Sequence, residues 1–135
     1  MEKQAVVDAS FLVALWRKRD RNHKWSVEQA KLHPPPWVTC ESALSEADHL
    51  LTPDGCATLR QACRRGALSI IPLGDGEFLP VLDLLDKYAD VPMSVADACL
   101  VRLTEVLPNP LLLTADSDFK IYRRHGRRTI PTAMP

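Results

Sequence analysis

The sequence predicts an α/β protein built on a parallel sheet of about four to five strands, with helices on both faces of the sheet. Short apolar runs alternate along the chain with longer segments in which apolar residues recur at helical spacing. Two helical segments sometimes follow one another between strands, and this order is typical of parallel sheets buried under helices. No internal repeat, low-complexity tract or linker interrupts it, so residues 1–135 are expected to form a single domain.

The composition is that of an ordinary globular chain and excludes several classes of protein. Hydrophobic residues make up 46% of the 135 residues and charged residues 25%, which is too apolar for a disordered protein. No apolar run is long enough to cross a bilayer, and the charged start MEKQAVVD is unlike a signal peptide. A cytoplasmic protein without a membrane partner is therefore expected. The balance of 17 basic and 17 acidic residues provides no overall basic field for nucleic acid.

The cysteines and histidines do not suggest a zinc site. No two cysteines form a CxxC pair, and the histidines show no spacing typical of metal ligands. We therefore expect reduced, buried thiols at Cys40, Cys56, Cys63 and Cys99.

The first half of the chain is expected to contain two short strands and four helices. Ser10 is the expected cap of the first helix, and three prolines at positions 34–36 form a stiff connector into the second strand. Gly66 is expected to end the fourth helix. The predicted strands are Gln4–Val7 and Trp37–Cys40, and the predicted helices are Phe11–Arg19, His23–His33, Glu41–Leu51 and Pro53–Arg65.

The second half is expected to contain two strands, two long helices and, near the end, a short helix and a last strand. Pro72 favours an end position over a central one for its strand. The helix that begins after Ser94 is apolar on nearly all sides, so we expect it to be the central buried helix. The predicted strands are Leu68–Leu73, Leu111–Thr114 and the tail Thr129–Pro131; the predicted helices are Glu77–Asp90, Val95–Leu107 and a short one up to Gly126.

Two aspartates come after predicted strands, where the functional crevice of an open parallel sheet lies. Asp8 directly follows the first strand, and Asp116 closely follows the strand Leu111–Thr114. Each could instead cap the helix after it, because a short polar side chain there accepts hydrogen bonds from free amides. Ser10 and Ser117 are better placed as these caps, which leaves the two aspartates for another role.

Two further acids lie on predicted helices. Asp97 fits the third position of a capping box that begins at Ser94, but its helix is otherwise apolar. A carboxylate near a buried surface is costly unless it is paired or bound to a metal. Glu46 borders the apolar stripe of its helix and could equally be a surface residue. The acids are informative as a set, because crowded carboxylates without a cation repel one another and take up protons.

Carboxylate oxygens in such a set suit Mg²⁺, which keeps several waters and needs only one or two direct carboxylates. A divalent cation there would stabilise charge on a phosphoryl oxygen and help to generate a hydroxide nucleophile. This is the chemistry of phosphodiester hydrolysis, and it requires no Ser-His or Cys-His pair.

Four short motifs occur along the chain: VVDAS at residues 6–10, SEA at 45–47, SVADA at 94–98 and LTADSDF at 113–119. With these motifs in this order the chain resembles a PIN-domain ribonuclease, and most of all the VapC-type toxins of bacterial toxin-antitoxin systems. Each motif is short, but their order, their spacing and the total length make the match specific. The resemblance spans essentially the whole chain and implies a PIN-like fold.

The resemblance also implies a catalytic site with a divalent metal, Mg²⁺ or Mn²⁺. Glu41 precedes Glu46 by five residues on the same predicted helix, and Glu46 is preferred for its SEA context and its place beside the apolar stripe. The implied catalytic acids are Asp8, Glu46, Asp97 and Asp116; the implied metal ligands are Asp8, Asp97, Asp116 and Asp118; Ser10 and Thr114 are hydroxyl neighbours of the metal.

The family further implies endonucleolytic cleavage of RNA that leaves a 5′-phosphate and a 3′-hydroxyl, inhibition by a partner antitoxin, and a homodimer. Two basic clusters are hypothesised to contact RNA phosphates, since such contacts supply affinity without sequence readout. Their members are Arg17, Lys18, Arg19, Arg21, Lys120, Arg123 and Arg124.

Two other functions remain as alternatives. One is a PIN-like module that binds nucleic acid or protein without turnover. The other is a haloacid-dehalogenase-like phosphatase, which also carries an aspartate after its first strand. That class needs a second acid two residues later, where this chain has Ser10.

Overall fold

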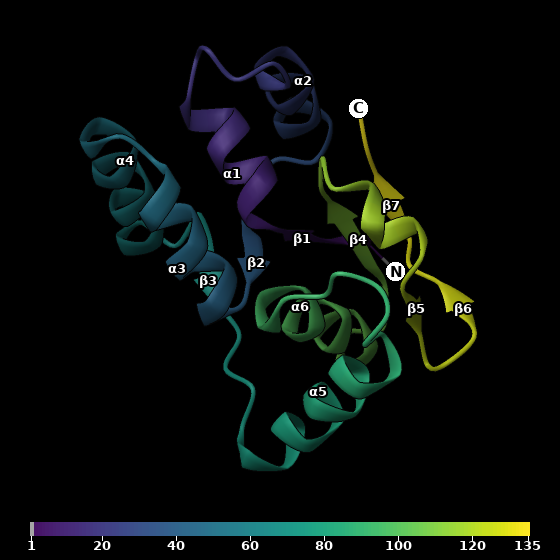
Figure 1. The fold of residues 1–135 in the computed structure, drawn as a ribbon. Coiled ribbons are helices and arrows are strands. Elements are labelled where there is room, and N and C mark those ends of the chain that lie inside the picture. The colour runs from purple at the N-terminus through teal and green to yellow at the C-terminus, as the bar shows by residue number, and fades with distance from the viewer. Residues whose placement is uncertain (1) are drawn as a thin grey trace.

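The computed structural model describes residues 2–135, and at its centre lies a parallel sheet of five strands (Figure 1). Their order across the sheet is β3-β2-β1-β4-β7. The strands are β1 (Gln4–Val7), β2 (Trp37–Thr39), β3 (Leu68–Ile70), β4 (Pro110–Leu113) and β7 (Thr132–Ala133). The predicted parallel sheet is confirmed, and β3, which ends before Pro72, is an edge strand.

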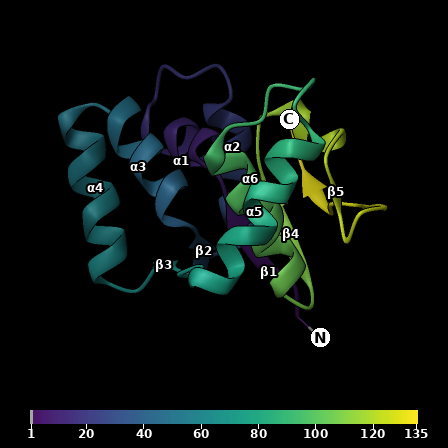
Figure 2. The same cartoon turned by 60° about the horizontal axis from the view of Figure 1, so that its bottom comes forward.

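Six α-helices in residues 2–135 cover the two faces of this sheet (Figures 1 and 2). They are α1 (Ala9–Trp16), α2 (His23–Leu32), α3 (Glu41–Leu50), α4 (Pro53–Arg64), α5 (Asp75–Lys87) and α6 (Val95–Val106). Figures 1 and 2 show α3 and α4 side by side, and α5 packed along α6, which in turn contacts α3. None of these helices is long and apolar enough to span a membrane.

Strand residues point alternately into two apolar cores, one on each face of the sheet. Val7 and Leu113 contribute to the core that α1 and α4 cover, together with Phe11 and Leu59. Val6 belongs to the core that α5 and α6 cover. This alternation follows from the two-residue period of a strand. Both faces are apolar, which explains why the strands appear in the sequence as continuous hydrophobic runs.

Capping side chains and one glycine set several helix ends. Thr52 caps α4 by accepting a hydrogen bond from the Gly55 amide at 3.3 Å. Ser94 and Asp97 form the predicted capping box at the start of α6. Gly66, with a φ of 77°, follows α4 and ends it as predicted, since positive φ carries no penalty for glycine.

Helix α6 is largely buried, as its composition predicts. Leu100, Val101 and Leu103 are all at most 1% exposed, and the helix contacts both α3 and α5. A capping box at its start therefore holds Asp97 at the border between this core and solvent.

The chain after β4 differs from the prediction of one helix up to Gly126. It forms a short 3₁₀ helix, η1 (Ser117–Lys120), and then an antiparallel hairpin of β5 (Arg123–Arg124) and β6 (Arg128–Thr129). His125 and Gly126 in the hairpin turn have φ values of 52° and 80°, which a right-handed helix cannot accommodate. The last strand is β7, which lies beyond the predicted Thr129–Pro131; the carbonyl of Pro131 still accepts a hydrogen bond from Leu112 of β4.

Candidate metal-binding active site

Asp8 and Thr114 lie next to each other at the carboxyl ends of β1 and β4. Val7 and Leu113 are partners in the register of these strands, so the residues that follow them leave the sheet at the same edge. The Thr114 hydroxyl donates a hydrogen bond to Oδ2 of Asp8, and both side chains are buried. Strand pairing therefore brings the predicted hydroxyl neighbour into direct contact with the predicted acid.

The other carboxylate oxygen of Asp8 is held by the start of α1. Oδ1 accepts hydrogen bonds from the Ser10 hydroxyl at 2.7 Å and from the Phe11 amide at 3.0 Å. Asp8 is thus the cap of α1, and the prediction that Ser10 caps this helix is wrong. Ser10 already lies inside the first turn, whereas Asp8 precedes it and can reach a free amide. Helix α1 accordingly begins at Ala9 and ends at Trp16, before the predicted Arg19.

Burial raises the pKa of the Asp8 carboxyl from 3.8 to about 6. The hydrogen bonds from Thr114, Ser10 and Phe11 oppose this rise because they stabilise the charged form. The negative charge of Asp116 adds to the rise. Asp8 is therefore a fixed carboxylate whose charge a nearby cation would stabilise.

Asp116 is the acid whose negative charge acts on the three others. Its negative charge contributes to the raised pKa of Asp8, Glu46 and Asp97, in each case after burial as the first cause. Asp116 therefore lies within electrostatic range of three acids that are far from it in the sequence.

Two hydrogen bonds fix Asp116. Its amide donates to the hydroxyl oxygen of Thr114 at 2.9 Å, and its Oδ1 accepts from the amide of Asp118 at 2.9 Å. Asp116 therefore caps η1, and the prediction that Ser117 caps the following helix is wrong. Within residues 2–135, Oδ2 of Asp116 has no hydrogen-bond partner and is free to take a ligand.

Asp97 is held at the start of α6 and by Tyr122. Its Oδ2 accepts from the amide of Ser94 at 3.1 Å and lies 3.4 Å from the Tyr122 hydroxyl, which itself donates to the carbonyl of Pro92 at 2.5 Å. Burial and the charge of Asp116 raise the pKa of Asp97, and the bonds to Ser94 and Tyr122 oppose them. Tyr122 is a site residue that the sequence did not predict. The only feature of the sequence that could have pointed to Tyr122 is its place three residues after Phe119, which puts two aromatic residues close together after the acids.

Glu46 approaches the other acids from α3. Its side chain is exposed, and its pKa is raised by partial burial and then by the charges of Asp97 and Asp116. Glu41 lies at the first position of the same helix. Glu46 is therefore within electrostatic range of Asp97 and Asp116, and its role as a catalytic acid stays a prediction.

Asp118 lies at the margin of this group. Its backbone is fixed, because its amide donates to Asp116 and its carbonyl accepts from the Tyr122 amide at 3.2 Å. Its half-buried side chain has no hydrogen bond among the described residues, and its charge helps to raise the pKa of Tyr122 after burial and Asp97.

The donor set of the acidic group suits Mg²⁺ or Mn²⁺. Among residues 2–135, no three His, Cys, Asp or Glu side chains form a preassembled metal cluster. The chemistry nevertheless fits these cations, because the donors are hard carboxylate oxygens that repel one another. Oδ1 of Asp97 and Oδ2 of Asp116 lack protein partners in the described chain. Mg²⁺ binds through one or two carboxylates and keeps its waters, so close packing of three acids is not required.

The basic residues of the two clusters fall into two groups. Arg17, Lys18, Arg19 and Arg21 in the α1–α2 loop are all exposed, as is Lys120, whereas Arg123 and Arg124 are half-buried. Arg123 donates to the backbone carbonyls of residues 120–122, from 2.6 to 3.2 Å. Arg124 donates to the carbonyls of Thr104 and Leu107 at 2.5 and 3.1 Å, so its guanidinium covers the end of α6.

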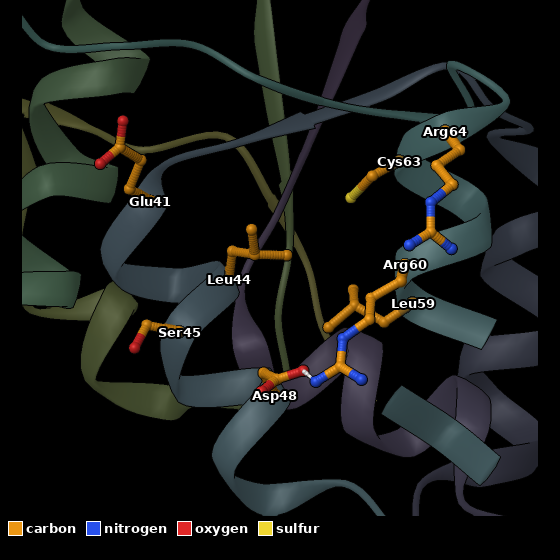
Figure 3. A pocket seen from close by; sticks show the side chains of 8 residues that line it. All are labelled: Glu41, Leu44, Ser45, Asp48, Leu59, Arg60, Cys63 and Arg64. Carbon is orange, nitrogen blue, oxygen red and sulfur yellow. Dashed lines mark hydrogen bonds and ion pairs between the residues drawn. The ribbon is translucent and has the colours of Figure 1, made fainter. Parts of the chain in front are cut away.

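A hollow of about 570 Å³ lies between α3 and α4 (Figure 3). Leu44, Leu59 and Cys63 give it an apolar lining, and the ion pair between Asp48 and Arg60, at 2.9 Å, crosses one end. None of Asp8, Glu46, Asp97 and Asp116 lines it. This apolar hollow is therefore separate from the acidic group.

The family model of the PIN domain matches residues 5–124, and the chain belongs to the PIN domain family. Its structure is similar to that of VapC20 from Mycobacterium tuberculosis, which is described as a Sarcin-Ricin loop cleaving toxin. The TM-score is 0.78 and the sequence identity 16%, over 87% of this chain and 94% of VapC20. At this identity the likeness establishes the fold. A comparison with curated proteins finds no match.

Proposed function

We propose that this PIN-domain protein is a divalent-metal-dependent endoribonuclease, acting as the toxin of a type II toxin-antitoxin pair. The observation that carries the proposal is the position of Asp8 and Asp116 at the carboxyl edge of the sheet, where both contact the hydroxyl of Thr114. The charge of Asp116 also raises the pKa of Asp8, Glu46 and Asp97, after burial as the first cause. Carboxylates that repel one another and keep free oxygens are suited to holding a cation beside a phosphodiester.

The protein's own groups would first hold the acids in place. Thr114 contacts Asp8 through its hydroxyl and Asp116 through the amide of that residue, so one side chain sets the spacing of two acids. Tyr122 and Ser94 orient Asp97 so that Oδ1 is left available. Glu46, which is exposed, is the acid best placed to accept a proton from an incoming water.

Asp8, Asp97 and Asp116 would hold Mg²⁺ or Mn²⁺, with Asp118 as a further ligand and Ser10 and Thr114 as hydroxyl neighbours. The bound cation would supply charge stabilisation on phosphoryl oxygens and lower the pKa of an attacking water. The expected products carry a 5′-phosphate and a 3′-hydroxyl.

RNA would be bound through phosphate contacts from exposed cations. The α1–α2 loop residues and Lys120 have charged groups available for this purpose. Arg123 and Arg124 already bind backbone carbonyls, so we assign them mainly to holding the hairpin and α6, with RNA contact restricted to their remaining donors.

The partners of the chain follow from the same proposal. The likeness in fold to a VapC toxin supports a cognate antitoxin, a homodimer, and action in the cytoplasm where cellular RNA is found. The proposal concerns the class of substrate, RNA, and not a particular RNA.

A cleavage assay tests this function. Single-stranded RNA is incubated with wild type, with Asp8→Asn and with Asp86→Asn, each with Mg²⁺ and with EDTA. Asp86 is an exposed acid on α5 and serves as the matched control. Cleavage by wild type and Asp86→Asn that requires Mg²⁺, and that Asp8→Asn lacks, would support the proposal. Activity that survives both the Asp8 substitution and EDTA would exclude the metal mechanism.

Metal titration by calorimetry separates this enzyme from a PIN-like binding module. A module without a working site should take up neither Mn²⁺ nor Mg²⁺, whereas the proposed site should bind Mn²⁺ in wild type and lose binding in Asp8→Asn. The phosphatase alternative has less support, because the position of its second acid is Ser10, whose hydroxyl already donates to Asp8.

A further inference from the structure

A groove of about 640 Å³ lies between α3 and the start of α6. Ser42, Ser45, Glu46 and His49 line it from α3, and Val95 lines it from α6. Glu46 is itself a lining residue, and Ser94, Val95 and Ala96 of the lining directly precede Asp97. The groove therefore adjoins the acids proposed to act on the scissile phosphate, and does not form a separate site elsewhere on the surface.

The lining of the groove is unsuited to phosphate. No Lys or Arg is among its lining residues, while Glu41 and Glu46 add two negative charges. A phosphate in the groove would meet like charge without a compensating donor of positive charge. The ribose-phosphate strand would therefore run outside the groove, toward the metal site and the exposed cations.

The same lining suits an uncharged, flat, hydrogen-bonding group. Val95 is 47% exposed and presents an apolar surface. Ser45 offers a hydroxyl that can donate or accept, and Ser42, whose hydroxyl donates to Sγ of Cys99 at 3.9 Å, offers its oxygen as an acceptor. A nucleobase combines an apolar face with donors and acceptors on its edge, and single-stranded RNA is read through both.

The side chain of His49 has no other structural role among the described residues. It lies one helical turn after Glu46 on the same side of α3, because residues three apart on a helix are neighbours. Its imidazole has no hydrogen bond, ion pair or ring contact within the described residues. The free imidazole from α3 and the apolar side chain from α6 therefore both line this shallow, open groove and provide two surfaces that a base can contact.

We propose that this groove binds one nucleobase of the RNA, adjacent to the scissile phosphate, with His49 as a specificity-determining residue that stacks on the base. The proposal rests on the endoribonuclease function above. Val95 packs against the base from α6, and the hydroxyl of Ser45 contacts its edge. The enzyme then prefers particular bases at one position beside the cut.

The first experiment measures cleavage preference. A pool of single-stranded RNA with randomised sequence is cut by wild type, His49→Ala, His49→Phe and His33→Ala, and the ends of the products are sequenced. His33 lies at the end of α2, outside the groove, and is the matched control. We expect a base preference at one flanking position in wild type and His33→Ala, its loss in His49→Ala, and its partial return in His49→Phe, which keeps a flat ring. An identical profile in wild type and His49→Ala would overturn the proposal.

The second experiment measures binding without turnover, by fluorescence anisotropy in EDTA. A short single-stranded RNA is compared with versions in which successive nucleotides lack their base. Removing one particular base should weaken binding to wild type about tenfold, within the range for base–aromatic stacking, and should have no further effect on His49→Ala. Equal sensitivity of the two proteins to every abasic position would overturn the proposal.

The two experiments distinguish the base site from the proposed catalysis. If the wild type binds RNA with the expected base dependence but never cuts it, the base site stands and the proposed endoribonuclease function is wrong. If the wild type cuts RNA and His49→Ala does not change the cleavage profile, the endoribonuclease function stands and the base site is wrong.

Discussion

The buried hydroxyl of Thr114, at the end of β4, donates a hydrogen bond to the buried carboxylate of Asp8, at the end of β1. Thr114 also accepts the amide hydrogen of Asp116 at 2.9 Å, so its hydroxyl joins two acids from opposite ends of the sequence. The pairing of β1 with β4 places the Thr114 side chain, and this side chain in turn holds Asp8 and Asp116 near each other in the candidate site.

Replacing Thr114 by valine should therefore affect both stability and activity. Valine keeps the shape but removes the hydroxyl, leaving the Asp116 amide and the Asp8 carboxylate without that partner. Unsatisfied buried groups cost about 1–3 kcal/mol each, so urea unfolding should show a decrease in stability of that order. RNA cleavage should fall, and Thr114→Ser should recover much of it because serine restores the hydroxyl. If valine matched wild type in cleavage, the link through Thr114 would have no functional role.

The raised pKa of Asp8 predicts how the metal-free protein responds to pH. The folded state holds a proton on Asp8 up to about pH 6, while an unfolded aspartate releases it near 3.8. Because the folded state binds more protons between these values, its stability declines as the pH rises through this window, by roughly 3 kcal/mol. The decline is complete above the folded pKa.

Asp8→Asn removes this penalty and tests the prediction. In EDTA, the thermal midpoint of Asp8→Asn should exceed that of wild type at pH 7.5, and the difference should shrink toward pH 4. Added Mg²⁺ should raise the midpoint of wild type at pH 7.5 but not that of Asp8→Asn. A difference between the two proteins that is constant with pH would contradict the raised pKa.

The sheet, and the position of Asp8 and Asp116 after its strands, were predictable because both follow from local patterns in the sequence. Apolar runs mark β1 and β4, and Asp8 and Asp116 follow them closely. The choice of cap was not predictable, because aspartate and serine both cap helices and only the position of the first turn decides between them. That position depends on how each strand ends, and the structure assigns the caps to the aspartates.

The parts that the sequence did not predict depend on contacts between distant segments. The hydroxyl of Tyr122, which lies between η1 and β5, reaches Pro92 just before α6 and Asp97 in its first turn. Arg124 covers the carbonyls at the end of α6, although it lies in a basic cluster that resembles an RNA-binding segment. Neither contact has a fixed spacing in the sequence, so periodicity and motifs could not reveal them.

The two aspartates after β4 should differ in their effect on cleavage. Asp116 influences three other acids and has a free Oδ2 among the described residues, whereas Asp118 contributes to the environment of Tyr122. Asparagine at position 116 still caps η1, so Asp116→Asn should fold but reduce cleavage at least about 100-fold, the upper range for perturbing a metal site. Asp118→Asn should reduce it about tenfold or less. Single-turnover rates for both variants provide the comparison, and a larger reduction for Asp118→Asn would reverse these roles.

The α1–α2 loop should account for part of the salt dependence of RNA binding. Replacing Arg17 and Lys18 by glutamine should weaken binding. It should also lower the slope of log affinity against log salt by about 0.7 for each phosphate of single-stranded RNA that the variant no longer neutralises. Arg64→Gln with Arg65→Gln is the control, because these residues lie beside the start of β3, at the edge opposite the acids. Anisotropy titrations at several salt concentrations measure the slope. Equal slopes for the two double variants would exclude the loop as a specific phosphate contact.

Tyr122→Phe tests whether a side chain outside the acids positions Asp97. The substitution removes one hydroxyl, which donates to Pro92 and lies 3.4 Å from Oδ2 of Asp97, and leaves the buried ring in place. We expect a decrease in stability of about 1 kcal/mol together with a lower kcat at unchanged KM. Tyr88→Phe is the matched control, since its hydroxyl accepts from the Arg123 amide at 2.9 Å and does not reach the acids. A purely structural role for Tyr122 would give equal decreases in stability and no difference in kcat between the two variants, whereas a positioning role lowers kcat in Tyr122→Phe alone.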